Sequence, residues 1–216
     1  MKALFGILAL GMGVAHAADM TILRYVDQDP GDPPYVTRIL VTPDFMRMDS
    51  GEDAGDFTLL DRQRRVVVNV MRDSKLAMVF APGVLPPKPA DWAPRLEAGE
   101  AVRGGRRFTL TLKDVVCSEG IAVKHAMDAA RAMGELKSIL AATQYRVWKE
   151  SPPDMRHDCD LANQVWNVDA TLTLGVPLEE REFTGRSRKL ESETRQPVDP
   201  ALFRVPEGMT EINAPS

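Results

Sequence analysis

The chain has 216 residues, with 27 Lys and Arg against 31 Asp and Glu, and its formal net charge is −4 at pH 7. This length suits a single domain with a hydrophobic core of its own. The acidic balance argues against a nucleic-acid partner, because such a protein needs a basic surface to neutralise phosphates, and against an electrostatic membrane anchor.

The first residues have the pattern of an export signal. Lys2 provides a positive start, a short apolar core follows, and Ala-His-Ala at 15–17 is a small-x-small cleavage site. We expect cleavage after Ala17, so that residues 1–17 are a signal peptide and residues 18–216 form one domain. The apolar core is too short to span a bilayer, and no apolar run of membrane-spanning length follows. The sequence therefore predicts an exported, periplasmic protein without a transmembrane segment.

The first half of the domain is predicted to form antiparallel strands. Residues 20–26 read as a first strand, and the turn-forming sequence DQDPGDPP follows it. Five further segments joined by short turns predict a meander, at residues 35–41, 45–49, 57–61, 65–71 and 75–80. Strands with such short links must lie side by side and run antiparallel.

Residues 81–94 carry five prolines and do not read as a central strand. Such a segment is expected to be extended and in part polyproline II. One interpretation is a covering loop whose Trp92 packs on the sheet. The other interpretation is a lid over a cavity.

The second half contains one clear helical pattern, after a strand at residues 108–112. Residues 121–142 predict a helix, because apolar side chains recur at steps of three and four: Val123, Met127, Ala130, Met133, Leu136 and Leu140. We expect this helix to lie across one face of the sheet.

The two cysteines that follow the signal are Cys117 and Cys159. In an oxidising compartment an even pair predicts a disulfide. The alternative is a metal or redox pair, but the sequence has no CxxC motif and the spacing is long. We therefore expect the Cys117–Cys159 disulfide.

Four more strands are predicted beyond the helix, and an irregular segment ends the chain. Residues 145–149 and 164–174 read as strands, the latter from strict alternation of apolar and polar residues. A last hairpin, at 178–183 and 189–195, is polar on both faces, which is typical of a sheet edge. The terminal segment is irregular and anchored by Phe203.

Three stretches together resemble a known family. TPDFMR at residues 42–47 is followed by LLD at 59–61, GVPL at 175–178 enters a hairpin, and residues 198–208 read VDPALFRVPEG. This order is similar to the LolA/LolB-like superfamily of periplasmic lipoprotein carriers and sensors, including related uncharacterised periplasmic domains, and the resemblance spans most of the chain. It implies an incomplete barrel with a helical lid or plug, whose concavity holds acyl chains in the carriers. Related domains bind other periplasmic proteins instead.

The residues and the resemblance lead to the same expected fold class. It is α+β: a curved antiparallel β-sheet, or incomplete barrel, with one main helix near residues 121–142 packed across the concave face. The signal lacks a lipobox, and the helix between two cysteines is not a carrier feature, so no binding residue of the family is carried over.

The sequence shows no catalytic arrangement. Only His125 and His157 follow the signal, neither has a partner nameable from the sequence, and there is no GxSxG motif. The run from His157 to Asp160 suits chelation poorly, and Met46 with Met48 as a soft-metal site is less common than core methionine. We expect no enzyme activity, no catalytic residue, no metal and no cofactor.

Methionines suggest a different role. Thioether side chains are flexible and polarisable, so they suit a lining that accepts varied apolar ligands. The candidate ligand-cavity residues are Met46, Met48, Met127, Met133, Trp166 and Leu172. The predicted function is a non-enzymatic periplasmic binding protein that holds an acyl chain, a lipoprotein or another hydrophobic ligand between sheet and helix. The alternative is an interaction or sensor module with a filled core and a periplasmic or envelope protein as partner.

Overall fold

The structure is a computed structural model that describes residues 19–102 and 104–215, so the predicted signal peptide lies outside the described residues. Its strands are β1 (Asp19–Gln28), β2 (Tyr35–Val41), β3 (Phe45–Asp49), β4 (Phe57–Asp61), β5 (Val66–Met71), β6 (Leu76–Phe80), β7 (Arg95–Val102), β8 (Gly105–Leu112), β9 (Val115–Val123), β10 (Val176–Glu182), β11 (Ser187–Pro197) and β12 (Thr210–Asn213). The helix that crosses the sheet is α1 (Met127–Glu150).

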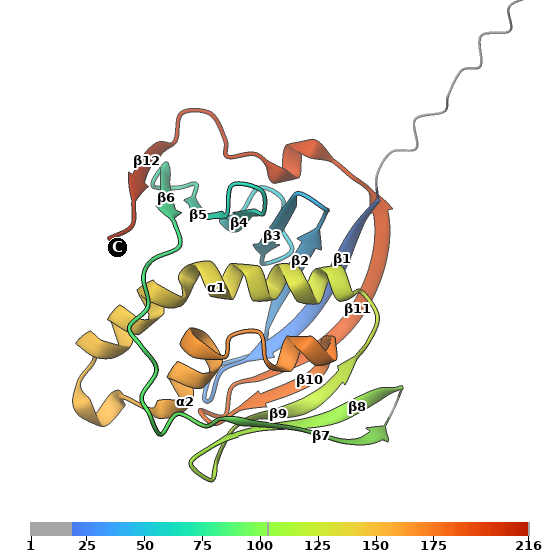
Figure 1. Ribbon diagram of the computed structural model, residues 1–216. Helices are drawn as coiled ribbons and strands as arrows, with labels where there is room; N and C mark the ends of the chain where they lie inside the picture. The colour runs from blue at the N-terminus through green and yellow to red at the C-terminus, as the bar shows by residue number, and fades with distance from the viewer. Residues whose placement is uncertain (1–18, 103, 216) are drawn as a thin grey trace, which may run out of the picture.

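All these strands belong to one strongly curved sheet that wraps around α1 (Figure 1). Their order is β12-β6-β5-β4-β3-β2-β1-β11-β10-β9-β8-β7, and β12 and β7 are the two edges. Neighbouring strands run antiparallel, apart from β12, which pairs parallel with β6. The fold is α+β with an unclosed sheet, which confirms the predicted fold class.

The predicted meander is confirmed as β2 to β6, which are consecutive neighbours in the sheet. The strand boundaries agree with the sequence pattern to within one residue. The turns after β4 and β5 are tight, and Arg65 and Lys75 adopt positive φ angles of 54° and 50° in them. Local alternation and turn chemistry were enough to predict this half of the sheet.

Helix α1 packs its buried face against the concave side of the sheet. Small side chains at Ala129 and Ala132 allow the helix to approach closely, and they meet Leu23, Tyr25 and Ile39 in one buried cluster. The helix follows Ala126, whose backbone is left-handed with φ 46°. The expected helix across one face is therefore present, although its ends differ from the prediction.

The helix predicted at residues 121–142 begins and ends too early, because α1 spans Met127–Glu150. Residues 121–123 complete β9, because Val123 pairs with Val176 of β10. Residues 145–149, predicted as a strand, are the last turns of α1. Their strand-like composition is overridden because the helix continues onto a second helical layer, where the Tyr145 and Trp166 rings lie 5.9 Å apart.

The prediction of a strand at 164–174 is also wrong. The chain from residue 153 to residue 174 forms short helical elements: η1 (Pro153–Met155), α2 (Asp158–Leu161), the π-helical turn η2 (Ala162–Trp166) and the 3₁₀ turn η3 (Thr171–Leu174). β9 pairs directly with β10, so no position remains between them for another strand. The segment instead packs on α1. Among the described residues, no helix has the length and apolarity needed to cross a membrane.

The last hairpin is not the sheet edge that its polarity predicted. β11 lies between β1 and β10 in the middle of the sheet. Its polar residues form cross-strand ion pairs, such as Glu191 with Arg24 and Arg188 with Asp27. The charged residues of β11 therefore pair with residues of the neighbouring strand, and they do not indicate an exposed edge.

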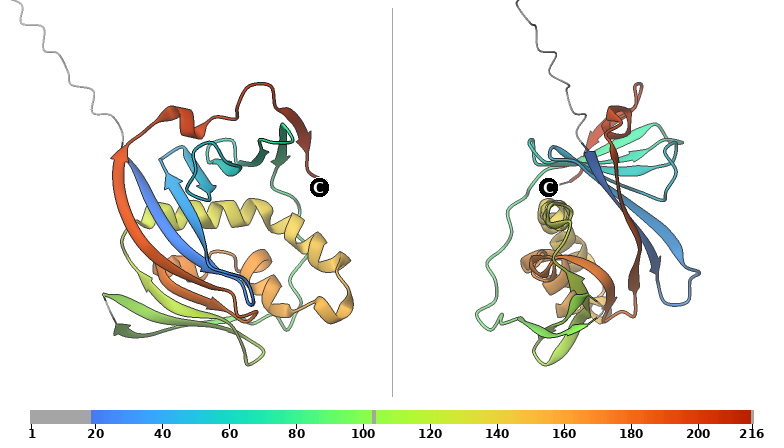
Figure 2. Two further views of the ribbon diagram at one scale, coloured as in Figure 1. Left: turned by 180° about the vertical axis from the view of Figure 1, so that it is seen from behind. Right: turned by 90° about the vertical axis from the view of Figure 1, so that its right-hand side faces the viewer.

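The chain's end covers the convex face of the sheet. The 3₁₀ turn η4 (Pro200–Phe203) places Phe203 in a buried cluster with Leu40 and Phe57. In both figures the terminal segment crosses the outside of the meander before β12 joins β6 (Figures 1 and 2). Phe203 is thus an anchor, as expected.

The proline-rich segment 81–94 runs from β6 to β7 across the open side of the barrel (Figure 2). Trp92 packs against the buried cluster that contains Leu110 and Leu112 of β8, and its ring lies 4.7 Å from that of Trp166. Trp166 Nε1 donates to the Pro86 carbonyl at 3.3 Å. This confirms the covering loop with a packed tryptophan.

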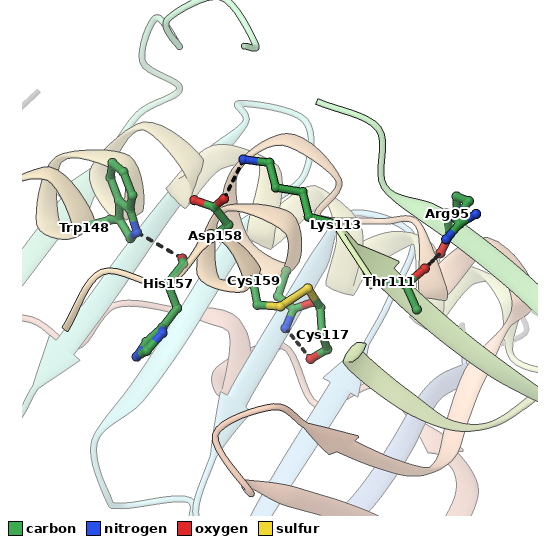
Figure 3. The surroundings of a disulfide bond; sticks show 9 residues. Arg95, Thr111, Lys113, Cys117, Trp148, His157, Asp158 and Cys159 are labelled. Atoms are coloured by element: carbon green, nitrogen blue, oxygen red, sulfur yellow. Dashed lines mark hydrogen bonds and ion pairs between the residues drawn. A yellow bond between two sulfur atoms is a disulfide. The ribbon is translucent and has the colours of Figure 1, made fainter. Parts of the chain in front are cut away.

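The predicted disulfide is present between Cys117 of β9 and Cys159 of α2, with both residues buried (Figure 3). Asn163 Nδ2 donates to the Cys117 carbonyl at 3.1 Å, and Lys113 Nζ donates to Asp158 at 3.0 Å. The disulfide and these hydrogen bonds thereby connect α2 and η2 to the sheet.

Candidate functional site

A cavity of about 260 Å³ lies between α1 and the concave face. Its apolar lining comes from both walls: Ile39, Met46, Met48, Met133, Leu136, Leu140 and Leu172. Alternate residues of β3 point to the same face, and residues three and four apart share one side of α1. The two periodicities therefore bring methionines of strand and helix together.

The polar lining of this cavity, named here the methionine cavity, comes mainly from β10 and β11. It consists of Lys137, Gln144, Gln164, Glu180, Glu182, Arg186, Ser187 and Arg188. Apolar groups thus gather on the β2–β3 side and charged groups on the β10–β11 side. This distribution suits an amphipathic guest.

Arg188 is held by a buried carboxylate. Its guanidinium donates two hydrogen bonds of 2.7 Å to Asp27, and Thr37 Oγ1 donates a third at 2.7 Å. Burial by itself raises the pKa of Asp27, but the hydrogen bonds and charge of Arg188 outweigh it, so the Asp27 pKa lies below its usual value. The charge of Arg188 is therefore neutralised within the protein.

Glu182 has the opposite environment. Burial raises the pKa of its carboxyl group, the nearby charge of Glu180 raises it further, and Lys137 offsets part of the shift. Neither glutamate is among the ion pairs formed within the described part of the chain. Two half-buried carboxylates thus face the methionine cavity without an ion pair among the described residues, although Lys137, Arg186 and Arg188 lie near enough to lower the Glu182 pKa.

A larger groove of about 540 Å³ lies on the other flank of α1. Met127, Ala130 and Leu172 are among its apolar lining. Arg62 closes one part of the groove: it donates to Glu135 at 2.7 Å and to Asp128 at 2.9 Å. Ion pairs from Arg62 to Asp128 and Glu135 thus connect the meander to α1 across this groove.

The structure brings four of the six sequence-predicted residues into the methionine cavity: Met46, Met48, Met133 and Leu172. Met127 lines the larger groove instead, and Leu172 borders both. Trp166 lines neither, because its ring packs between Trp92 and Tyr145. The proline-rich segment contributes to neither lining, so it is not a lid over these two spaces.

Sequence reasoning missed the charged side of the cavity. Glu180, Glu182 and Arg188 read as surface charges, because the hairpin was placed at an edge. Leu136 and Leu140 could have been named from the helical stripe that includes Met133. The charged groups could be recognised only from the position of β10 and β11 in the sheet.

The two histidines lie outside the methionine cavity. His125 precedes α1, and its Nε2 contacts the carboxylate of Glu193 in β11. His157 precedes α2, and its ring lies 5.3 Å from that of Phe183. Each histidine therefore has a local structural partner.

No family model matches the sequence, and no curated protein matches it. Among solved structures, PNGF-II in two crystal forms aligns with 91% of this chain at 10% and 11% identity, each with a TM-score of 0.38. The chain spans about a third of PNGF-II, 31% and 32%. A LolA superfamily protein from Nitrosomonas europaea aligns at 8% identity and a TM-score of 0.31, covering 88% of this chain and 91% of that one. Likenesses this weak carry no argument about function.

Proposed function

We propose that the protein is a non-enzymatic binding protein that holds an acyl chain or another apolar ligand in the methionine cavity. The observation that carries the proposal is the 260 Å³ space with apolar side chains on both walls and charged groups along one side. Ligand sites are commonly concave and largely apolar, with a few polar groups that orient the ligand.

The lining favours binding over catalysis. Neither histidine nor cysteine is among the described residues that line the methionine cavity. Arg188 is held by Asp27 at 2.7 Å, so it offers little to a reacting group. The proposal therefore includes no catalytic role.

The methionines suggest a tolerant site. Met46, Met48 and Met133 come from two elements that face each other across the space. Their side chains can adopt several rotamers at low cost, so the lining can adapt to ligands of different shape. We expect affinity to follow the apolar surface of the ligand more than its detailed geometry.

Two variants on α1 test which space binds the ligand. Leu140 lines the methionine cavity and Ser138 lines the larger groove. Leu140→Trp fills the first space, and Ser138→Trp fills the second with the same side chain. We expect an apolar fluorescent probe, N-phenylnaphthylamine, to lose at least about tenfold in affinity with Leu140→Trp and to bind Ser138→Trp as it binds the wild type.

Fluorescence titration and circular dichroism of each variant give the readout and the folding control. Equal probe binding by the wild type and Leu140→Trp, both folded, would contradict the proposal. Loss of binding only with Ser138→Trp would move the site to the larger groove and would also contradict it.

A second candidate function is a protein-interaction module. The exposed side chains of Val147 and Met155, which are 52% and 63% exposed, favour it, and they border a hollow of about 200 Å³ beside Trp148. The partner would be a periplasmic or envelope protein. Val147→Asp with Met155→Asp would remove such an interaction in a pull-down from the native cell and leave probe binding unchanged.

The proposed place of action is the periplasm. The buried disulfide between Cys117 and Cys159 supports it, because such bonds persist in oxidising compartments. Alkylation of thiols in intact cells, before and after reduction, would test it. Two alkylated cysteines before reduction would contradict an exported, oxidised protein.

A further inference from the structure

The charged side of the methionine cavity carries two carboxylates, Glu180 and Glu182. β10 places Glu180 and Glu182 on the concave face, because alternate residues of a strand point the same way. Both carboxylates are half-buried at the cavity wall. They are the acidic residues of the lining.

The two arginines of the lining are already paired with carboxylates. Arg188 is neutralised by Asp27, and Arg186 lies 3.6 Å from Asp29 and donates to the Tyr35 hydroxyl at 3.2 Å. These two aspartates leave the lining with the positive charge of Lys137 against two negative charges. The free charge of the cavity is therefore acidic.

Two buried hydroxyls without a partner lie on strands next to this wall, behind the residues that line the cavity. Ser118 is directly opposite Glu182 in the β9–β10 ladder, so both side chains project from one face. Its Oγ has no hydrogen-bond partner among the described residues, although Ser118 is 2% exposed. The Tyr25 hydroxyl is likewise buried and unpartnered, and its ring lies below Arg188, the cross-strand neighbour of Glu180.

Unpaired buried hydroxyls are uncommon because leaving them unsatisfied costs free energy. The two carboxylates at the cavity wall accept hydrogen bonds only, and they form no ion pair among the described residues. A primary ammonium group supplies three N–H donors and one positive charge, which these carboxylates are able to accept.

We propose that the ligand is a cationic amphipath whose alkylammonium head group pairs with Glu180 and Glu182 while its chain fills the methionine cavity. This inference rests on the proposed function and adds the chemical class of the head group. The apolar residues of β2, β3 and α1 receive the chain.

Three ligands of one chain length test the head group: decylamine, decanol and decanoic acid, each below its aggregation concentration at neutral pH. We expect decylamine to displace the fluorescent probe at about one tenth of the decanol concentration, as for a charge-assisted hydrogen bond. We expect decanoic acid to bind more weakly than decanol, because its carboxylate would face Glu180 and Glu182.

Glu180→Gln with Glu182→Gln keeps the shape of both side chains and removes their charge. We expect it to reduce the preference for decylamine over decanol to about twofold or less. The matched control is Glu119→Gln, which removes a charge from an exposed residue of the adjacent strand β9. This control should keep the full preference.

The outcomes separate the two proposals. If all three ligands bind equally, or decanoic acid binds best, the head-group inference is wrong and the binding function stands. If Glu119→Gln reduces the preference as much as the double variant, the preference comes from overall charge and the inference is again wrong. If none of the three ligands displaces the probe, the proposed function itself is wrong.

Discussion

The two faces of the sheet are covered in different ways. On the concave face, α1 lies across the curve and leaves spaces of about 260 and 540 Å³ on its flanks. On the convex face, the irregular terminal segment follows the surface and seats Phe203 against Leu40 and Phe57. A helix is a stiff rod about 10 Å across, so it cannot follow a curved wall, whereas an irregular chain can.

The charged residues of the two faces differ in part, although the concave face also holds one buried ion pair, Arg188 with Asp27. On the convex side Arg47, 1% exposed, donates to Asp49 at 2.6 Å and to the Leu202 carbonyl at 3.0 Å. On the concave side Glu180 and Glu182 have no such partner among the described residues. The chain's own contacts thus satisfy Arg47 on the convex face, whereas the two glutamates of the concave face form no ion pair and are the groups that the proposed binding function uses.

The largest expected effect comes from removing the disulfide that holds the short helical elements on the concave face of the sheet. Replacing Cys117 and Cys159 by Ala removes a cross-link over 42 residues. We expect the free energy of unfolding to fall by about 4 kcal/mol, because the disulfide lowers the conformational entropy of the unfolded chain and its removal restores that entropy. Urea denaturation of the oxidised wild type and the double variant measures it. A loss below about 1 kcal/mol would show that the helical layer is held by packing alone.

The next effect tests the convex face. Phe203→Ala should cost about 3 kcal/mol of unfolding free energy, because it empties a well-filled position beneath the terminal segment. The Phe45 and Phe203 ring centroids are 6.0 Å apart, so this ring contact is lost as well. Probe binding at the methionine cavity should not change. A change in probe affinity would show that the two faces are coupled.

A smaller loss is expected for the matching truncation on the concave face. Met133→Ala should cost about 2 kcal/mol, at the low end for buried methionine, because its side chain already borders a space. The same urea series gives the comparison with Phe203→Ala. If Met133→Ala is the more costly of the two, the helix is as tightly packed as the convex cover and the contrast between the faces is wrong.

The smallest effect is a dependence on pH. Burial raises the pKa of Glu182 in the folded state, with Glu180 raising it further and Lys137, Arg186 and Arg188 lowering it. A carboxyl group with a raised folded pKa costs stability as pH rises from its unfolded value, about 4.3, through the folded value. Glu182→Gln removes this cost. We therefore expect the variant to gain stability relative to the wild type as pH rises from about 4 to 7.

Thermal unfolding of both proteins across this pH range measures that difference. Glu119→Gln, on the exposed side of β9, serves as the control and should show no such trend. A stability difference that shrinks with rising pH would mean that Glu182 is stabilised as a carboxylate by a partner.

The sequence alone was sufficient for the meander and for the disulfide. The strands from β2 to β6 depend on alternation and on tight turns, which are local properties of the chain. Cys117 and Cys159 were the two cysteines that an oxidising compartment would pair. The chemistry of methionine also singled out Met46, Met48 and Met133, which do meet in one cavity.

Tertiary structure decided the second half. Residues 145–149 and 164–174 have strand-like composition, but β9 pairs with β10 and leaves them no partner strand, so they fold as helical cover. The polar hairpin became the middle of the sheet because β11 pairs with β1, far away in the sequence. The same pairing turned Glu180 and Glu182 from surface charges into a cavity wall. Local patterns specify which segments can be strands, whereas long-range pairing decides which of them find partners and what their side chains face.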